Sequence, residues 1–192
     1  MTYYEGVLVT DHDSLNAAAI GAEIDEARIG CQIYMPSDTA RKLEDDVDFT
    51  FSLTTDPELF YKAALTGHND PETSELEKDS LEKEGPYLYP EQATRTYYCR
   101  VESNKEITEE DEYGEARIKL VEGKVLEIDG DLEHIGRENP LVDAMVHATR
   151  MFVADREQRK AIKERVENIL KGHEYDLKRK ILDFVEGKTD EV

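Results

Sequence analysis

Residues 3–10, YYEGVLVT, and residues 16–24, NAAAIGAEI, open the run of short strands that decides the fold. The first stretch is rich in residues that favour β-structure, and Asp11-His12-Asp13 after it predicts a turn. A third strand is expected at residues 29–35. Residues 48–54, DFTFSLT, alternate strictly between apolar and polar side chains, which is typical of a strand with one buried face.

The strand pattern continues in the middle of the chain. Strands are expected at residues 94–102, 114–121 and 124–129, with an acidic turn at 104–112. The last two strands are predicted to form a hairpin around Glu122-Gly123. Many short strands joined by turns indicate a barrel rather than an open parallel sheet.

Two helices interrupt the strands. Residues 37–46 predict a short helix that Ser37 or Asp38 caps. Residues 56–67 predict a second helix, because they combine a capping residue, a first-turn proline and a final glycine, at Asp56, Pro57 and Gly67.

After Gly136 the pattern becomes helical. Helices are expected at residues 139–153, 156–171 and 174–186, each with an apolar face, and Gly172 and Gly187 are expected to end the last two. The sequence therefore predicts a barrel domain at 1–137, with an acidic surface loop at 68–92, and a helical segment at 138–192 that packs on the barrel or on a partner subunit.

Charge and composition exclude several classes of protein. The net charge is −21, and residues 1–137 carry −20 of it (13 Lys+Arg against 33 Asp+Glu). So negative a field repels nucleic acid and anionic membrane surfaces. We find neither a run of eighteen apolar residues nor a signal peptide, and Cys31 and Cys99 lie far apart. A cytoplasmic protein with free thiols is expected, although a disulfide between the two remains an alternative.

The segment Ser37-Asp-Thr-Ala-Arg-Lys42 is a candidate phosphate site. A helix N-terminus offers unpaired N–H groups, Ser37 and Thr39 add hydroxyls, and Arg41 and Lys42 add cations. The alternative is an ordinary capped surface helix whose cations face solvent.

The segment Asn16-Ala-Ala-Ala-Ile-Gly21 leaves a strand surface with almost no side-chain bulk. A flat ligand could lie on it, with Asn16 hydrogen-bonded to a heterocycle edge. The alternative is that these small residues pack under a helix.

A third candidate pair is His147 and Arg150, three residues apart on one helix. They could touch an anionic ligand, and His147 could transfer a proton. The alternative is a polar pair at a helix edge, with Arg150 bridged to Asp143 or Asp155. The other histidines show no metal-ligand spacing, and no Walker, G-x-S-x-G or G-x-G-x-x-G motif occurs.

The segments YEGVLVT, NAAAIGAE, SDTARKL, DPELFYKAALTG and VDAMVHATR together resemble an archaeal family of uncharacterised proteins with the FMN-binding split β-barrel fold. Flavin reductases and pyridoxamine-phosphate oxidases share that fold. The resemblance implies a mainly β fold with α, that is, a split antiparallel β-barrel plus C-terminal helices. It also implies a homodimer, with FMN in a groove near the dimer interface.

Carried over by position, the resemblance implies which residues bind the cofactor. The flavin ring would face Asn16, Ala17, Ala18 and Ala19, and the FMN phosphate would be held by Ser37, Thr39, Arg41 and Lys42. His147 and Arg150 would lie near the ligand. The chain departs from the family pattern at Ala19, where proline is frequent, and at Ala40-Arg41-Lys42, where an asparagine often follows the threonine.

Three functions follow from this resemblance. The first is an FMN-dependent oxidoreductase of unknown substrate, with His147 as the best acid or base candidate and no metal. The second is a non-catalytic flavin carrier or redox sensor, which the absence of a clear acid/base pair favours. The third is an interaction module that kept the barrel and lost the cofactor.

Overall fold

The computed structural model describes residues 1–66, 75–111 and 114–190. Its elements in chain order are β1 (Thr2–Thr10), β2 (Asn16–Ile24), β3 (Arg28–Tyr34), α1 (Asp38–Lys42), β4 (Asp48–Leu53), α2 (Pro57–Leu65), the 3-10 helix η1 (Lys78–Ser80), β5 (Leu81–Glu84), β6 (Tyr87–Pro90), β7 (Arg95–Asp111), β8 (Gly114–Gly130), α3 (Pro140–Thr149), the 3-10 helix η2 (Arg150–Phe152), α4 (Arg156–Ile169) and α5 (Asp176–Asp190).

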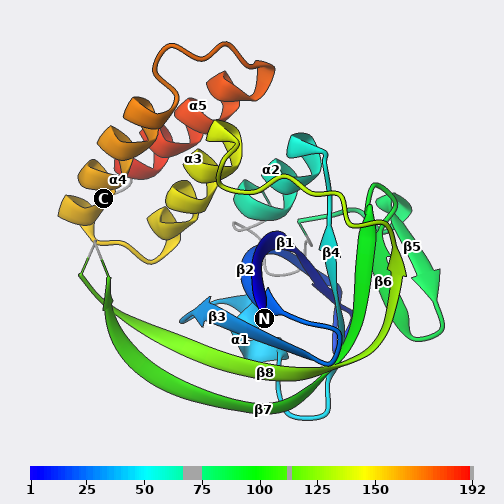
Figure 1. Cartoon of the computed structure of the whole chain (residues 1–192). Coiled ribbons are helices and arrows are strands. Elements are labelled where there is room, and N and C mark those ends of the chain that lie inside the picture. The colour runs from blue at the N-terminus through cyan, green and yellow to red at the C-terminus, as the bar shows by residue number, and fades with distance from the viewer. Residues whose placement is uncertain (67–74, 112–113, 191–192) are drawn as a thin grey trace.

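Six strands close into an antiparallel barrel in the order β1-β2-β3-β8-β7-β4, and the helices α2 to α5 gather on one side of it (Figure 1). The predicted split antiparallel barrel with C-terminal helices is confirmed. The apolar face of β4 points into the barrel, where Phe49, Phe51 and Leu53 are buried, as the alternation predicts. Burying each of these side chains contributes about 1.5–3 kcal/mol.

The acidic stretch predicted as a loop at 68–92 contains a hairpin instead. Residues 68–74 lie outside the described residues, but β5 and β6 pair with each other and cover the outer face of β4. Thr50 on that face is fully buried and its Oγ1 donates to the carbonyl of Leu88 at 2.7 Å. Acidic side chains here accept hydrogen bonds from tyrosines, as Glu84 does from Tyr98 at 2.8 Å. The acidity therefore did not indicate a solvated loop.

The strands β7 and β8 are also longer than predicted. The expected turn at 104–112 is wrong for its described residues, because β7 runs unbroken to Asp111. The expected hairpin turn at Glu122-Gly123 is wrong too, because both residues lie within β8. Gly123 marks a close approach: a Cβ there would lie 3.1 Å from the Arg100 carbonyl oxygen and from Ile29 Cγ2.

The helix predictions hold in type and differ at their ends. Helix α1 has only five residues, shorter than the predicted 37–46. Helix α2 ends at Leu65, and the predicted stop at Gly67 lies outside the described residues. Gly172 follows α4 with φ +80, as a helix-ending glycine does. Gly187 does not end α5, which continues to Asp190.

The helices have a core of their own, separate from the barrel interior. Phe60 of α2 belongs to a buried cluster that also contains residues of α3, α4 and α5. Lys180 of α5 pairs with Glu58 of α2 at 2.9 Å. Among the described residues, no helix has the length and apolar character needed to span a bilayer. Cys31 and Cys99 are both buried free thiols.

Candidate functional site

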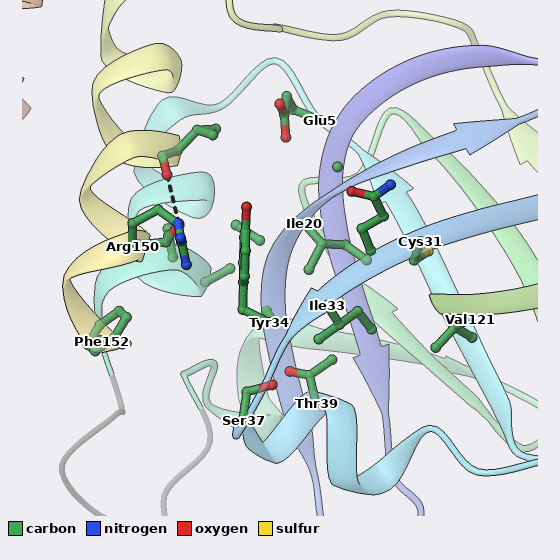
Figure 2. Close-up of a pocket in the computed structure, with 18 of the residues that line it drawn as sticks. Glu5, Ile20, Cys31, Ile33, Tyr34, Ser37, Thr39, Val121, Arg150 and Phe152 are labelled. Atoms are coloured by element: carbon green, nitrogen blue, oxygen red, sulfur yellow. Dashed lines mark hydrogen bonds between the residues drawn. The ribbon is translucent and has the colours of Figure 1, made fainter. Parts of the chain in front are cut away.

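A cleft of about 830 Å³ lies between the barrel and the helices. Its barrel side comes from β2, β3, α1 and β8, and its helical side from α2, α3 and η2. Figure 2 shows Ser37 and Thr39 at one end, Glu5 at the other, and Tyr34 and Arg150 between them. The volume falls in the range of sites for small molecules and cofactors.

Small residues of β2 form part of the barrel wall of the cleft. Ala18 and Ala19 line it, followed by Ile20 and Gly21. Ala17 is buried on the other side, in the cluster that includes Leu59 and Ala63 of α2. Both interpretations of this segment, a surface for a flat ligand and a strand packed under a helix, therefore apply. Ala18 and Ala19 border the cleft, whereas Ala17 packs under α2.

Asn16 does not line the cleft itself but contacts a residue that does. Its side chain is buried, and its Nδ2 donates to Thr39 Oγ1 at 3.0 Å. Thr39 itself lines the cleft. The first residue of the small-residue strand thus positions a hydroxyl of the second predicted segment, which joins the two segments into one structure.

The end of the cleft near α1 carries hydroxyls and a cation; we call Ser37, Thr39 and Arg41 the hydroxyl end. Ser37 caps α1, with Oγ accepting from the Ala40 amide at 3.2 Å. Arg41 lines the cleft and pairs with Asp38 across one turn. Because α1 is so short, the hydroxyls and the guanidinium supply most of the polar character here.

Lys42 belongs to a different contact. Its Nζ donates to Ser14 Oγ at 2.7 Å and to the Ser14 carbonyl at 3.0 Å, and it is not among the residues that line the cleft. Burial lowers the pKa of Lys42, an effect that the nearby carboxylate of Glu75 opposes. Lys42 ties α1 to the turn between β1 and β2.

The helical wall of the cleft contains His147 and Arg150, both buried. The Arg150 guanidinium carbon lies 3.9 Å from the centroid of the Tyr34 ring, a stacked cation–π contact. Arg150 is therefore buried in the wall of the cleft, against Tyr34. The guanidinium that contacts Asp143 is that of Arg137, with Nε 3.1 Å from Oδ1.

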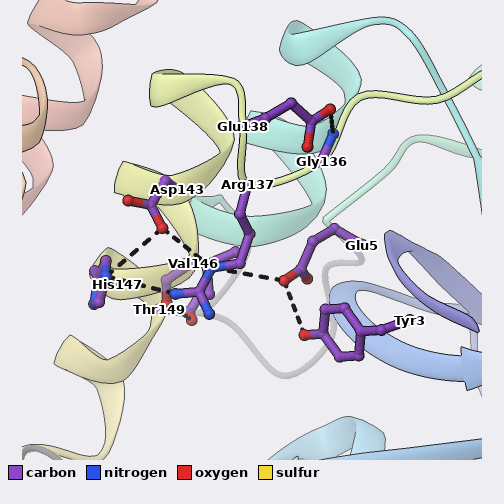
Figure 3. A network of polar contacts seen from close by, with 9 residues as sticks. All are labelled: Tyr3, Glu5, Gly136, Arg137, Glu138, Asp143, Val146, His147 and Thr149. Carbon is purple, nitrogen blue, oxygen red and sulfur yellow. Dashed lines mark hydrogen bonds and ion pairs between the residues drawn. The ribbon is translucent and has the colours of Figure 1, made fainter.

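The opposite end of the cleft joins β1 to α3; we call Tyr3, Glu5 and Arg137 the carboxyl end (Figure 3). Tyr3 donates its hydroxyl to Glu5 Oε1 at 2.9 Å, and Arg137 Nε lies 4.0 Å from the same oxygen. Arg137 continues the network to α3, where its Nη2 lies 3.5 Å from Nε2 of His147.

Burial is the largest influence on Glu5, whose side chain is only 2% exposed. Burial raises the pKa of the Glu5 carboxyl, while the Tyr3 hydrogen bond and the Arg137 charge oppose that rise. Burial and the neighbouring Glu5 also raise the pKa of the Tyr3 hydroxyl. These residues were missed from sequence; the signal that could have found them is an acid within an otherwise apolar strand.

The described residues of the site form no cluster of metal ligands. In residues 1–66, 75–111 and 114–190, His, Cys, Asp and Glu side chains nowhere gather in threes as metal ligands would. The polar groups that border the cleft include hydroxyls, guanidiniums and carboxyls, and of these carboxyls that of Glu5 is buried.

Comparisons with solved structures place the fold. An FMN-bound protein from Methanosarcina mazei, of the family DUF447, superposes with a TM-score of 0.65 at 17% identity, over 96% of this chain and 93% of that one. A flavoredoxin from Methanosarcina acetivorans gives 0.50 at 12% identity (69% and 70%). An NADH:FAD oxidoreductase from Streptomyces globisporus gives 0.53 at 10% identity (70% and 80%).

Sequence comparison gives the family. No curated protein matches the chain. A family model, described as the N-terminal domain of a protein of unknown function (DUF447), matches residues 4–127. That match spans more than half of the chain and most of the barrel, and the chain therefore belongs to the DUF447 family.

Proposed function

We propose that this protein binds FMN in the cleft and works as a flavin-dependent oxidoreductase. The observation that carries the proposal is the composition of one continuous cleft. It has a wall of small β2 residues, a stacked Tyr34–Arg150 pair, and the hydroxyl end with Ser37, Thr39 and Arg41. The FMN-bound relative of the same family supports the choice of ligand.

The residues fit FMN part by part. The hydroxyl end suits a phosphate, because a guanidinium and two hydroxyls give charge-assisted hydrogen bonds to its oxygens. Ala18 and Ala19 leave room for a flat ring to approach the strand. Asn16 positions the Thr39 hydroxyl at the hydroxyl end. Bound FMN supplies the redox chemistry that protein side chains lack.

Parallel titrations with FMN and riboflavin test the ligand. Both change the visible spectrum and fluorescence when bound, and they differ in the phosphate alone. We expect FMN to bind at least about tenfold more tightly, because one hydrogen bond to a charged group contributes about 1.5–3 kcal/mol. Equal affinities for FMN and riboflavin would show that the hydroxyl end does not bind the phosphate. If neither ligand binds, the proposed function is wrong.

The oxidoreductase part has its own test. The FMN-loaded protein is mixed anaerobically with NADH or NADPH, and bleaching of the flavin band is followed. Bleaching with turnover on an added acceptor supports an enzyme. Bound flavin that neither nucleotide reduces and that passes no electrons to acceptors after photoreduction would instead indicate a carrier.

We also propose a homodimer. Apolar side chains are exposed on and just after the second half of β8, where Leu126 and Leu132 are 45% and 49% exposed and Ile128 is 36% exposed. Burial of such side chains favours association. Light scattering on the purified protein tests this, and a monomer at micromolar concentration would contradict it.

A further inference from the structure

Glu5 occupies an unusual place for a carboxyl group. It lies on β1, between strand neighbours that are largely apolar, and it pairs in register with Gly21 of β2. The residue is only 3% exposed, yet it lines the cleft, at the end opposite Ser37 and Thr39 (Figure 2). Carboxyl groups are rarely buried to this extent without a specific partner.

The contacts of Glu5 fix one of its oxygens. Tyr3, two residues earlier on the same face of β1, donates to Oε1 at 2.9 Å. Arg137 approaches the same oxygen at 4.0 Å. The Tyr3 hydroxyl reaches this position across Gly21, where a Cβ would lie 1.8 Å from it. Among the described residues, both contacts fall on Oε1, so Oε2 keeps its lone pairs for a ligand.

Charged groups face Glu5 from each neighbouring element. Arg137, in the segment before α3, favours the carboxylate, whereas Asp143 on α3 favours the protonated acid. His147 lies behind them, with Nε2 3.7 Å from Asp143 Oδ1. On β2, Glu23 is exposed beside Tyr3. Burial raises the pKa of Glu5, so the group holds a proton at higher pH than an ordinary carboxyl. Tyr3 and Arg137 then stabilise the anion once the proton has left.

We propose that Glu5 is the proton donor of this cleft and that the electron acceptor it serves carries a polar double bond, as a quinone or an enone does. The inference rests on the proposed FMN-dependent function, which supplies the hydride. Tyr3 and Arg137 are positioning residues that act through Glu5.

The atoms and electrons balance as follows. A hydride carries two electrons away from the reduced flavin, which is thereby oxidised. That hydride forms a bond to one atom of the acceptor's double bond, and the π electron pair of the double bond moves to the other atom. The O–H bond of Glu5 breaks, and its proton bonds to that second atom. Glu5 remains as a carboxylate, held by the Tyr3 hydroxyl and Arg137, and regains a proton from solvent. An acceptor that takes single electrons needs none of these steps.

Another acidic group on the cleft wall does not suit this role. Cys31 lines the cleft, but burial raises the pKa of its thiol to about 12, so it gives up no proton near neutral pH.

The experiment compares two acceptors on the same photoreduced, FMN-loaded protein by stopped flow. Cyclohex-2-enone takes a hydride and a proton, whereas ferricyanide takes single electrons. We expect Glu5→Gln to slow reoxidation by cyclohex-2-enone about a hundredfold, the low end of what a general acid contributes, and to leave the ferricyanide rate unchanged. Tyr3→Phe should shift the pH profile of the cyclohex-2-enone rate without abolishing it. Glu23→Gln is the matched control, because it removes an exposed acid of the same cleft.

A second measurement needs neither cofactor nor acceptor. Infrared titration of the ligand-free protein follows the C=O band of protonated carboxyl groups. Burial raises the pKa of Glu5 and of Glu75, so absorbance from both should persist to higher pH than that of ordinary carboxyl groups. The part that belongs to Glu5 should disappear in Glu5→Gln and remain in Glu23→Gln. Tyr3→Phe should shift the pH at which it disappears.

Several outcomes would overturn the inference. If Glu5→Gln reacts with both acceptors at the wild-type rate, Glu5 is not the proton donor. Equal slowing with both would make Glu5 a structural residue. If the wild type reduces ferricyanide but not cyclohex-2-enone, the proposed class of acceptor is wrong. FMN affinity is measured first in every variant, so a failure to bind FMN, which would end the proposed function too, is recognised separately.

Discussion

The two ends of the cleft are built in different ways. The hydroxyl end comes from one stretch of chain, with Ser37, Thr39 and Arg41 inside a capped turn. The carboxyl end brings Tyr3 and Glu5 of β1 together with Arg137, more than a hundred residues later in the sequence. The first end carries two hydroxyls and an exposed guanidinium that pairs with Asp38. The second is a buried carboxyl that Tyr3 and Arg137 contact, and Arg137 connects it to α3 (Figure 3).

In the functions proposed above, the hydroxyl end holds the ligand and the carboxyl end takes part in its reaction. A phosphate site needs charge and donors at local spacing, which one turn provides. A proton-donating site needs a perturbed pKa, which requires burial and partners from several elements. Four substitutions test how far this division holds.

The largest effect is expected at the hydroxyl end. Arg41→Ala should weaken FMN binding by about 1.5–3 kcal/mol, because a hydrogen bond to a charged group is lost. Lys42→Ala is the control and should change affinity by no more than about 0.5 kcal/mol, since Lys42 contacts Ser14 rather than the cleft. Fluorescence titration measures both. If the two variants behave alike, the assignment of the phosphate to Arg41 is wrong.

A slightly smaller effect is expected from breaking the hydrogen bond between Asn16 and Thr39, which joins the small-residue strand to the hydroxyl end. Thr39→Val leaves the buried Nδ2 of Asn16 without its acceptor and should lower the free energy of unfolding by about 1–3 kcal/mol. Urea denaturation measures it. In the double variant with Asn16→Leu the losses should not add, because both partners are then apolar. Additive losses would mean that this hydrogen bond contributes little.

The contact between Tyr34 and Arg150, which lies between the two ends of the cleft, should contribute less to stability again. Tyr34→Leu removes the ring under the Arg150 guanidinium and should cost about 0.5–2 kcal/mol of stability, the range for cation–π contacts from exposed to desolvated sites. A double-mutant cycle with Arg150→Met isolates this contact. A coupling energy near zero would show that Arg150 is held by its other packing.

The smallest expected effect is at the carboxyl end. It is a change in how the free energy of unfolding depends on pH. The folded-state pKa of Glu5 is raised, so between its unfolded and folded pKa values the folded protein binds more protons than the unfolded chain. Stability should therefore fall as the pH rises through that window. The pKa of Glu75 is raised as well, so only the difference between wild type and Glu5→Gln isolates Glu5. Identical pH dependence in thermal melts of the two proteins would contradict this.

Elements that depend on residues close together in the sequence were predicted correctly, whereas elements that depend on contacts between distant residues were not. The alternation in β4 and the cap and proline of α2 are local, and the structure confirms the elements that they predicted. The hairpin β5–β6 was missed because its acids accept tyrosine hydrogen bonds from β7 and within the hairpin, as Glu84 does from Tyr98. The long β7 was cut short because polar residues in an exposed strand look like a turn.

By itself, the sequence determined that the first part of the chain is rich in strands, that a helical segment follows it, and that Ser37 caps α1, because hydrophobic period, capping and turn chemistry act over a few residues. The order of the strands around the barrel came from the tertiary structure. The tertiary structure alone decided that Lys42 leaves the cleft, that Arg150 stacks on Tyr34, and that Glu5 becomes a buried acid beside Arg137. Burial and electrostatic partners come from chain closure across the barrel and from α3. No local pattern encodes which distant side chain will supply them.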